Sequence, residues 1–218
     1  MWLVAKSFRA NIRNYNNAFA FSSLGVDIDH SVYGPSGIYT FRIRGELTHR
    51  IGSLLPVSNQ RPRFSQIYIF DSDPQHQAET RLSYHHGLLN RSTVLQLQHM
   101  LRVHNPYIHV FMTAKERLDV NENVSLCLKT VDSEHLDHRR YNRPTASEIA
   151  VIMPGTGEEQ FDKRDIVLQA RNGPFKRISE LHSAYCPLRY PILFPNGQQG
   201  WHPDMRSNSS YLLFYSIH

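Results

Sequence analysis

The stretch LHSAYCPLRYPILFPNGQQGW, residues Leu181 to Trp201, decides how the rest of the chain is organised. Three prolines recur in it at four-residue steps, at Pro187, Pro191 and Pro195. Proline removes a backbone donor and clashes with the preceding turn, so no helix is expected through the stretch. Its apolar and aromatic residues are unfavourable in water, which argues against a disordered linker. We expect an extended segment, buried against a core and turned at Asn196-Gly197, a dipeptide that suits positive φ.

The remaining sequence has to supply a surface that receives this segment. Of the 218 residues, 40% are hydrophobic and 20% are charged, which is typical of a folded soluble protein. Cys127 and Cys186 are far apart and have no CxxC partner, so neither a disulfide framework nor a cysteine zinc site is indicated. The N-terminal apolar run, in MWLVAKSFRANIR, is too short for a signal peptide or a membrane helix. We expect a soluble intracellular chain with no membrane partner.

Strand signals dominate the pattern. A β-like run around Phe19 and Phe21 within residues 14–29 is expected to pair with a strand in which Tyr39, Phe41 and Ile43 alternate with polar residues. The run FSQIYIFD, residues 64–71, is apolar on both faces and is interpreted as a central strand, closed by the polar residues 71–77. Further strands are expected at residues 124–128, 148–154 and 165–170, and a short helix is expected to start within residues 175–182.

Two helices are expected in the middle of the chain. Asn90 or Ser92 can cap the first, which carries apolar residues at helical spacing. Asn105-Pro106 gives the second an N-cap and a proline at the first helical position. The sequence thus predicts an α+β domain: a mostly antiparallel sheet, two central helices packed on one face of it, and a C-terminal proline-rich extended segment.

No motif for catalysis, metal or cofactor binding emerges. Gly155-Thr156-Gly157 is followed by two glutamates and lacks the lysine of a phosphate loop, which indicates a surface turn. A rolling-circle nuclease of the HUH type needs two histidines flanking one hydrophobic residue, and no such triplet occurs. His85-His86 and the pair His135 and His138 are interpreted as surface histidines, because they lack convergent ligands. Neither cysteine has an activating context.

Two groups of arginines are candidate nucleic-acid contacts in this chain of formal charge +5. In the loop EHLDHRRYNRP, interleaved arginines and one aromatic residue suit a phosphate backbone and a stacked base; these are Arg139, Arg140, Tyr141 and Arg143. The alternative is a solvated loop whose arginines pair with the neighbouring acids. The second group comprises Arg42 and Arg44 on a strand, with Arg50, Arg61 and Arg63 following.

Several longer stretches, taken together and in order, resemble one family. They are NIRNYNNAFAFSSLGVDID (11–29), GIYTFRIRGELTHRIGSLLP (37–56), PRFSQIYIFD (62–71), RRYNRPTASEIAVIMPG (139–155) and RDIVLQARNGPFKRISELHSAYCPLRYPILFPNGQQGW (164–201). The chain is similar over residues 7–203 to the Helitron helicase-like N-terminal domain of Helitron transposon proteins, and residues 204–218 form a divergent tail. The chain departs from the family at Phe111-Met112-Thr113-Ala114, where an arginine is common, and at Cys186, where aspartate is common.

The resemblance implies nuclear DNA transactions. Full-length relatives join this region to a rolling-circle nuclease and a helicase, and only those parts carry the nuclease residues and the ATP and Mg sites. We therefore expect a non-catalytic, DNA-associated or scaffolding module, a truncated copy that needs no cofactor, with single-stranded DNA and the nuclease and helicase domains as partners. The alternative is part of an ATP-dependent helicase or HUH nuclease whose catalytic domains are missing. We also expect Tyr190, Ile192, Phe194 and Trp201 to be partly exposed, where the catalytic half of relatives continues.

Overall fold

Helices and antiparallel strands share the chain, as the α+β prediction requires. The computed structural model describes residues 2–28, 43–121, 123–129, 149–154 and 165–203. One three-stranded sheet has the order β1-β2-β6, from Ser23–Ile28, Ile43–Ile51 and Lys176–Ile178. The other has the order β4-β3-β5, from Ala150–Pro154, Val124–Leu128 and Ile166–Gln169. Every pairing is antiparallel.

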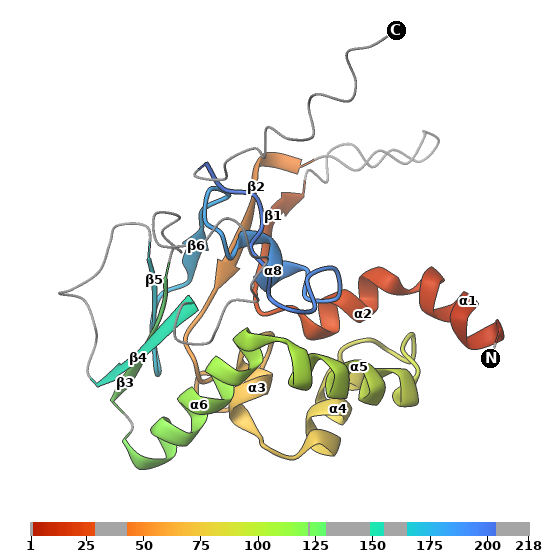
Figure 1. Ribbon diagram of the computed structural model, residues 1–218, viewed down its shortest axis with the longest axis horizontal. Coiled ribbons are helices and arrows are strands. Elements are labelled where there is room, and N and C mark those ends of the chain that lie inside the picture. The colour runs from red at the N-terminus through yellow and green to blue at the C-terminus, as the bar shows by residue number, and fades with distance from the viewer. Residues whose placement is uncertain (1, 29–42, 122, 130–148, 155–164, 204–218) are drawn as a thin grey trace, which may run out of the picture.

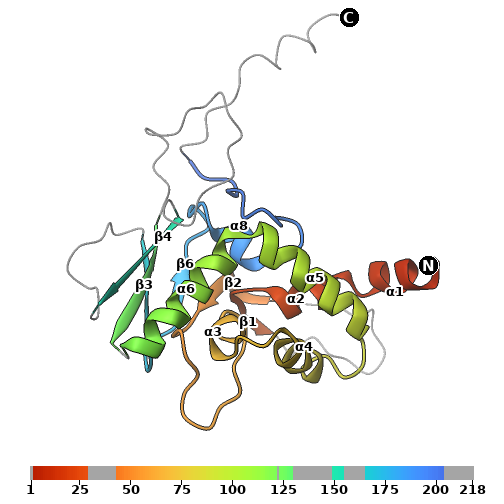
Figure 2. The same ribbon diagram turned by 60° about the horizontal axis from the view of Figure 1, so that its bottom comes forward.

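The two sheets and the helices occupy distinct parts of the molecule. In both views the β4-β3-β5 sheet lies at one side and α1 (Trp2–Ala10) at the opposite side (Figures 1 and 2). The helices α3 (Gln66–Phe70), α4 (Pro74–Ser83), α5 (Arg91–His104) and α6 (Pro106–Val120) gather between them (Figure 2). All five residues of β3 are buried, because both faces of this central strand are covered.

The two predicted central helices are confirmed, with their caps. The Asn90 side chain accepts a hydrogen bond from the Thr93 amide at the start of α5, at 3.1 Å. The Asn105 side chain accepts one from the Tyr107 amide at the start of α6, at 3.0 Å, with Pro106 at the first helical position. Each cap satisfies a donor that has no partner within its helix. The side chains of Ile108 and Phe111 are buried on the inner face of α6.

Three strand or helix assignments from the sequence are wrong. Residues 12–19 form the helix α2 (Ile12–Phe19) rather than a turn and strand, because Tyr15, Ala18 and Phe19 share a buried helical face. The expected central strand at residues 64–71 is α3, since a short apolar run does not distinguish a buried strand from a buried helix. The expected helix start at residues 175–182 is instead β6, which pairs with β2.

The helix α4 replaces the expected polar closure at residues 71–77. The Asp73 side chain accepts a hydrogen bond from the Gln75 amide at 3.0 Å, and Pro74 occupies the first turn. This Asp-Pro start has the same chemistry as Asn105-Pro106. The sequence therefore carries a helix-start signal at Asp73-Pro74.

The proline-rich stretch is only partly as predicted. It contains a short helix, α8 (Tyr185–Arg189), with Pro187 as its third residue. The amides of the first helical turn have no intrahelical acceptor, so proline at that position loses no hydrogen bond. The predicted turn at Asn196-Gly197 is confirmed, and Gly197 has φ +62°. Tyr190, Ile192 and Phe194 are partly exposed and Trp201 is exposed, as expected.

Two parts of the chain form the surface that receives this stretch: α2 with the residues that follow it, and the start of α6. The Phe21 amide donates to the Leu188 carbonyl at 2.8 Å, and the Asn16 side-chain amide donates to the Arg189 carbonyl at 3.0 Å. At the other side, Gly197 lies against the ring of Pro106 at the start of α6. The stretch thus joins α2 to α6.

Among the described residues, no helix is long and apolar enough to cross a bilayer.

Candidate nucleic-acid interface

The structure describes only part of the two predicted arginine groups. Arg42, Arg139, Arg140, Tyr141 and Arg143 lie outside the described residues. For Arg44 the backbone alone is described, paired with Asp27 across β1 and β2.

Arg61 and Arg63 are exposed on the segment that leads from β2 to α3, and the fold brings them together with Arg50 at the end of β2. These three arginines line one concave surface, which we call the arginine groove.

The arginine groove has an outer and an inner part. The outer part, of about 1100 Å³, is bounded by the end of β2, the segment before α3 and the segment before β6. No aspartate or glutamate is among its described lining residues, which are Phe21, Ser23, Arg50, Ile51, Gly52, Ser53, Val57, Gln60, Arg61, Arg63, Phe64, Ser65, Gln66, Tyr84, Asn172, Gly173 and Phe175. Phe175 is 74% exposed and its ring lies over Gly52. The surface therefore combines arginine side chains, with no acid among its described lining residues, with one accessible aromatic face.

The inner part, which we call the inner pocket, has a volume of about 420 Å³. It shares Ser23, Arg63, Phe64 and Tyr84 with the outer part, so the two hollows adjoin. Arg63 stands at the junction, with its guanidinium 5.3 Å from the centroid of the Tyr84 ring. Among the described residues, the inner pocket too is lined without a carboxylate, by Asn17, Ala18, Ser23, Leu24, Arg63, Phe64, Ile67, Arg81, Tyr84, His85 and Arg189.

Arg81 of α4 lies at the bottom of the inner pocket and has an exposed fraction of 0%. Its guanidinium carbon is 4.4 Å from the ring centroid of Tyr68 and 4.8 Å from that of Phe19, which are cation–π distances. Nη1 donates to the Ala18 carbonyl and Nε donates to Gln98 Oε1 at 3.4 Å. Burial lowers the pKa of Arg81, and the neighbouring Tyr68 opposes that shift. The group stays charged because arginine is not deprotonated in proteins.

Arg189, the last residue of α8, is 4% exposed and approaches the same end of α2. Nη1 donates to the Ser22 carbonyl at 2.9 Å, and Nη2 donates to Asn17 Oδ1 at 2.5 Å. Burial lowers its pKa, with Tyr190 opposing. Neither Arg189 nor Arg81 lies within 4.0 Å of a carboxylate among the described residues.

The C-terminal end of α2 explains why two arginines converge here. The last carbonyls of a helix have no intrahelical partner and carry about half a negative charge. Arg81 donates to the Ala18 carbonyl, and the Tyr68 hydroxyl donates to the Phe19 carbonyl at 2.7 Å. Arg189 reaches Ser22, three residues further on. These donors satisfy the carbonyls at the end of α2. The two guanidinium groups bring more positive charge than the partial negative charge of the helix end.

Sequence reasoning missed both buried arginines. Arg81 lies among polar residues of α4. The neighbouring sequence of a buried arginine in such a helix does not differ from that of an exposed one. Arg189 carried a usable signal, because it stands between Pro187 and Pro191 in an otherwise apolar stretch. An arginine there has to meet acceptors inside the fold.

A metal centre is not formed by the described part of the chain, where no group of three His, Cys, Asp or Glu converges. His85 and His86 lie in the turn after α4, and burial, with His86 nearby, lowers the pKa of His85. Cys127 is buried in β3, where burial raises the pKa of its thiol to about 12. At neutral pH the Cys127 thiol is therefore protonated, whereas a nucleophile or metal ligand has to be the thiolate.

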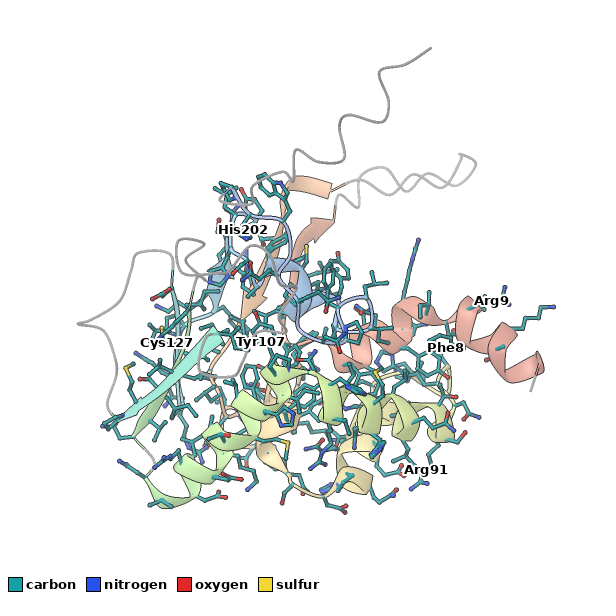
Figure 3. The ribbon with its side chains drawn as sticks, viewed as in Figure 1. Phe8, Arg9, Arg91, Tyr107, Cys127 and His202 are labelled. Atoms are coloured by element: carbon teal, nitrogen blue, oxygen red, sulfur yellow. The ribbon has the colours of Figure 1, made fainter. Side chains whose placement is uncertain are left out.

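Arginines elsewhere on the surface are differently arranged. Arg91 at the start of α5 points away from the body of the molecule (Figure 3). Its guanidinium is neutralised by Glu79 at 2.7 Å and also donates to Gln75. The arginine groove thus differs from the surface around Arg91 in that its described lining residues include no acid. In comparisons with family models, with curated proteins and with solved structures, nothing matches the chain.

Proposed function

We propose that the chain is a non-catalytic, DNA-associated module of a Helitron-like rolling-circle transposon protein, and that the arginine groove holds single-stranded DNA. The motif order in the sequence supports the family. The groove supports the activity: Arg50, Arg61 and Arg63 line it together, and its described lining residues include no carboxylate. The module works in the nucleus and positions DNA for the nuclease and helicase domains of a full-length relative.

The groove suits a single strand better than a duplex. Phosphate contacts come from arginine, and Phe175 presents an aromatic face on which an unpaired base stacks. Base stacking on an aromatic side chain is tolerant of sequence, and phosphate contacts carry no sequence information. We therefore expect binding with little sequence preference. No cofactor is needed for this role.

Fluorescence anisotropy with an oligothymidylate of about 12 nucleotides tests the proposal, since single-strand sites span roughly 4–16 nucleotides. The logarithm of the affinity should fall linearly with the logarithm of salt concentration, by about 0.7 per phosphate contact. The double variant Arg61→Gln/Arg63→Gln should lower that slope by about 1.4. Arg91→Gln, outside the groove, is the matched control and should leave it unchanged.

An affinity that does not fall with rising salt would overturn the proposal, as would an equal effect of the groove and control variants. Assays of ATP hydrolysis and of metal-dependent nicking address the enzymatic alternative. Clear turnover by the purified chain in either assay would show that the chain is catalytic and would contradict the proposed positioning role.

A further inference from the structure

The inner pocket contains two buried positive charges, Arg81 and Arg189, and no carboxylate is among its described lining residues. Arg81 and Arg189 are 0% and 4% exposed, and a buried charge is costly unless it is paired and hydrogen-bonded. The end of α2 offers about half a negative charge against two guanidinium groups. Arg63 adds a third at the mouth of the same pocket. The described residues therefore leave this pocket with a net positive charge.

Hydrogen-bond donors are also left over. Nη2 of Arg81 and Nε of Arg189 are buried and have no hydrogen-bond partner among the described residues. The hydroxyl of Ser22, whose carbonyl binds Arg189, is likewise without a partner. Buried donors in proteins almost always have acceptors. An anion in the pocket would supply acceptors for the guanidinium groups that line it.

We propose that the inner pocket binds one phosphate group, held by Arg81, Arg189 and Arg63. The planar guanidinium fork matches the oxygens of phosphate. The charge of the phosphate, near −2 in a monoester and −1 in a diester, offsets part of the positive charge of this pocket. The volume of about 420 Å³ admits a phosphate together with the sugar that carries it. The inference rests on the proposed function in one respect: the strand in the outer groove delivers the phosphate past Arg63.

Thermal unfolding of the full chain in sodium phosphate, compared with sodium chloride at equal ionic strength, tests the site. Phosphate in several-fold excess over its Kd should raise the Tm by about 2–4 °C. Arg189→Gln should abolish the rise, and Arg91→Gln should retain it. Phosphate also stabilises proteins by exclusion from their surface, so an equal rise in all three proteins would overturn the site.

A second variant guards against loss of folding at the buried position. Arg63 is exposed, so Arg63→Gln should fold, and it should reduce the Tm rise. No rise in the unsubstituted chain, or an undiminished rise in Arg63→Gln, would overturn the site. The outcome is separable from the proposed function, because a further titration of oligothymidylate with the single variant Arg61→Gln tests the outer groove and leaves the inner pocket intact.

The phosphate can be a monoester at a strand end or a diester within the strand. Titration with a short oligonucleotide, with and without a 5′ phosphate, distinguishes them. A roughly tenfold tighter binding of the phosphorylated form, lost in Arg189→Gln, identifies the strand end; this ratio corresponds to about 1.4 kcal/mol. Equal binding of both forms, weakened equally in Arg189→Gln, identifies a diester. Binding of both forms that Arg189→Gln leaves unchanged would overturn the site.

Discussion

The imidazole of His49 lies flat against the ring of Tyr185, with the ring centroids 3.9 Å apart. Tyr190 meets the same imidazole edge-on at 5.9 Å, and the His49 side chain is buried. Burial, and second the positive charge of Arg189, lowers the pKa of His49 to about 4. This histidine joins β2 to the proline-rich stretch and is neutral at pH 7.

The low pKa of His49 predicts a loss of stability in acid. The unfolded chain protonates this residue as the pH falls through its ordinary value of 6.5, whereas the folded chain does so only near 4. Between these values the unfolded state binds more protons, so the free energy of unfolding falls as the pH falls. The difference between the two pKa values corresponds to a loss of at most about 3–4 kcal/mol. Urea unfolding between pH 7 and pH 4 measures it.

The matched variant for this test is His49→Phe, which keeps the stacked ring and removes the titrating nitrogens. Its free energy of unfolding should depend less on pH than that of the unsubstituted chain. Other histidines contribute equally to both proteins and cancel in the difference. Parallel pH profiles for the two proteins would refute the role assigned to His49.

Gly197→Ala should destabilise the protein by about 2–4 kcal/mol, which denaturant unfolding measures. Gly197 has φ +62°, and a Cβ atom there would lie 2.7 Å from Cδ of the Pro106 ring. The variant therefore adds backbone strain and a clash with the start of α6. Gly87→Ala is the control, because Gly87 has φ +78° and open space around it. If both variants cost the same, the packing of Gly197 on Pro106 is unimportant.

Phe175→Ala should weaken oligothymidylate binding by about 1–3 kcal/mol, the range for loss of one stacked base. Its stability should change little, because the side chain is 74% exposed. Phe70→Ala removes another exposed phenylalanine, 52% exposed and absent from the groove lining. Anisotropy titrations of both variants compare the two positions. An affinity unchanged by Phe175→Ala would remove stacking from the proposed mode of binding.

The sequence predicted those elements whose start is marked by local chemistry. Asn90 and Asn105 cap helices where expected, and the apolar residues 124–128, 150–154 and 166–169 form strands. The sequence-based prediction was wrong where the conformation depends on burial in the fold and not on a local signal. The residues Ile67, Tyr68 and Ile69 are buried in a helix, and a continuous apolar run carries no period that distinguishes it from a strand.

For the candidate site, exposed basic residues close in sequence were found and buried ones were not. Arg61 and Arg63 were predicted from their clustering and do line the groove. Arg81 and Arg189 are 108 positions apart, and no local pattern connects them. Only the tertiary fold, through the end of α2, brings the two together.

The closure of α2 by distant residues also sets the order in which the chain can fold during synthesis. The Asn16 side chain binds the Arg189 carbonyl across 173 positions of sequence, and Arg189 binds the Ser22 carbonyl across 167. At roughly 5–20 residues per second, a ribosome takes about 8–35 s to make that much chain. Until then the end of α2 and its aromatic neighbours lack their cover. Exposed apolar surface favours aggregation, so we expect the nascent N-terminal half to be most prone to aggregation before the proline-rich stretch emerges.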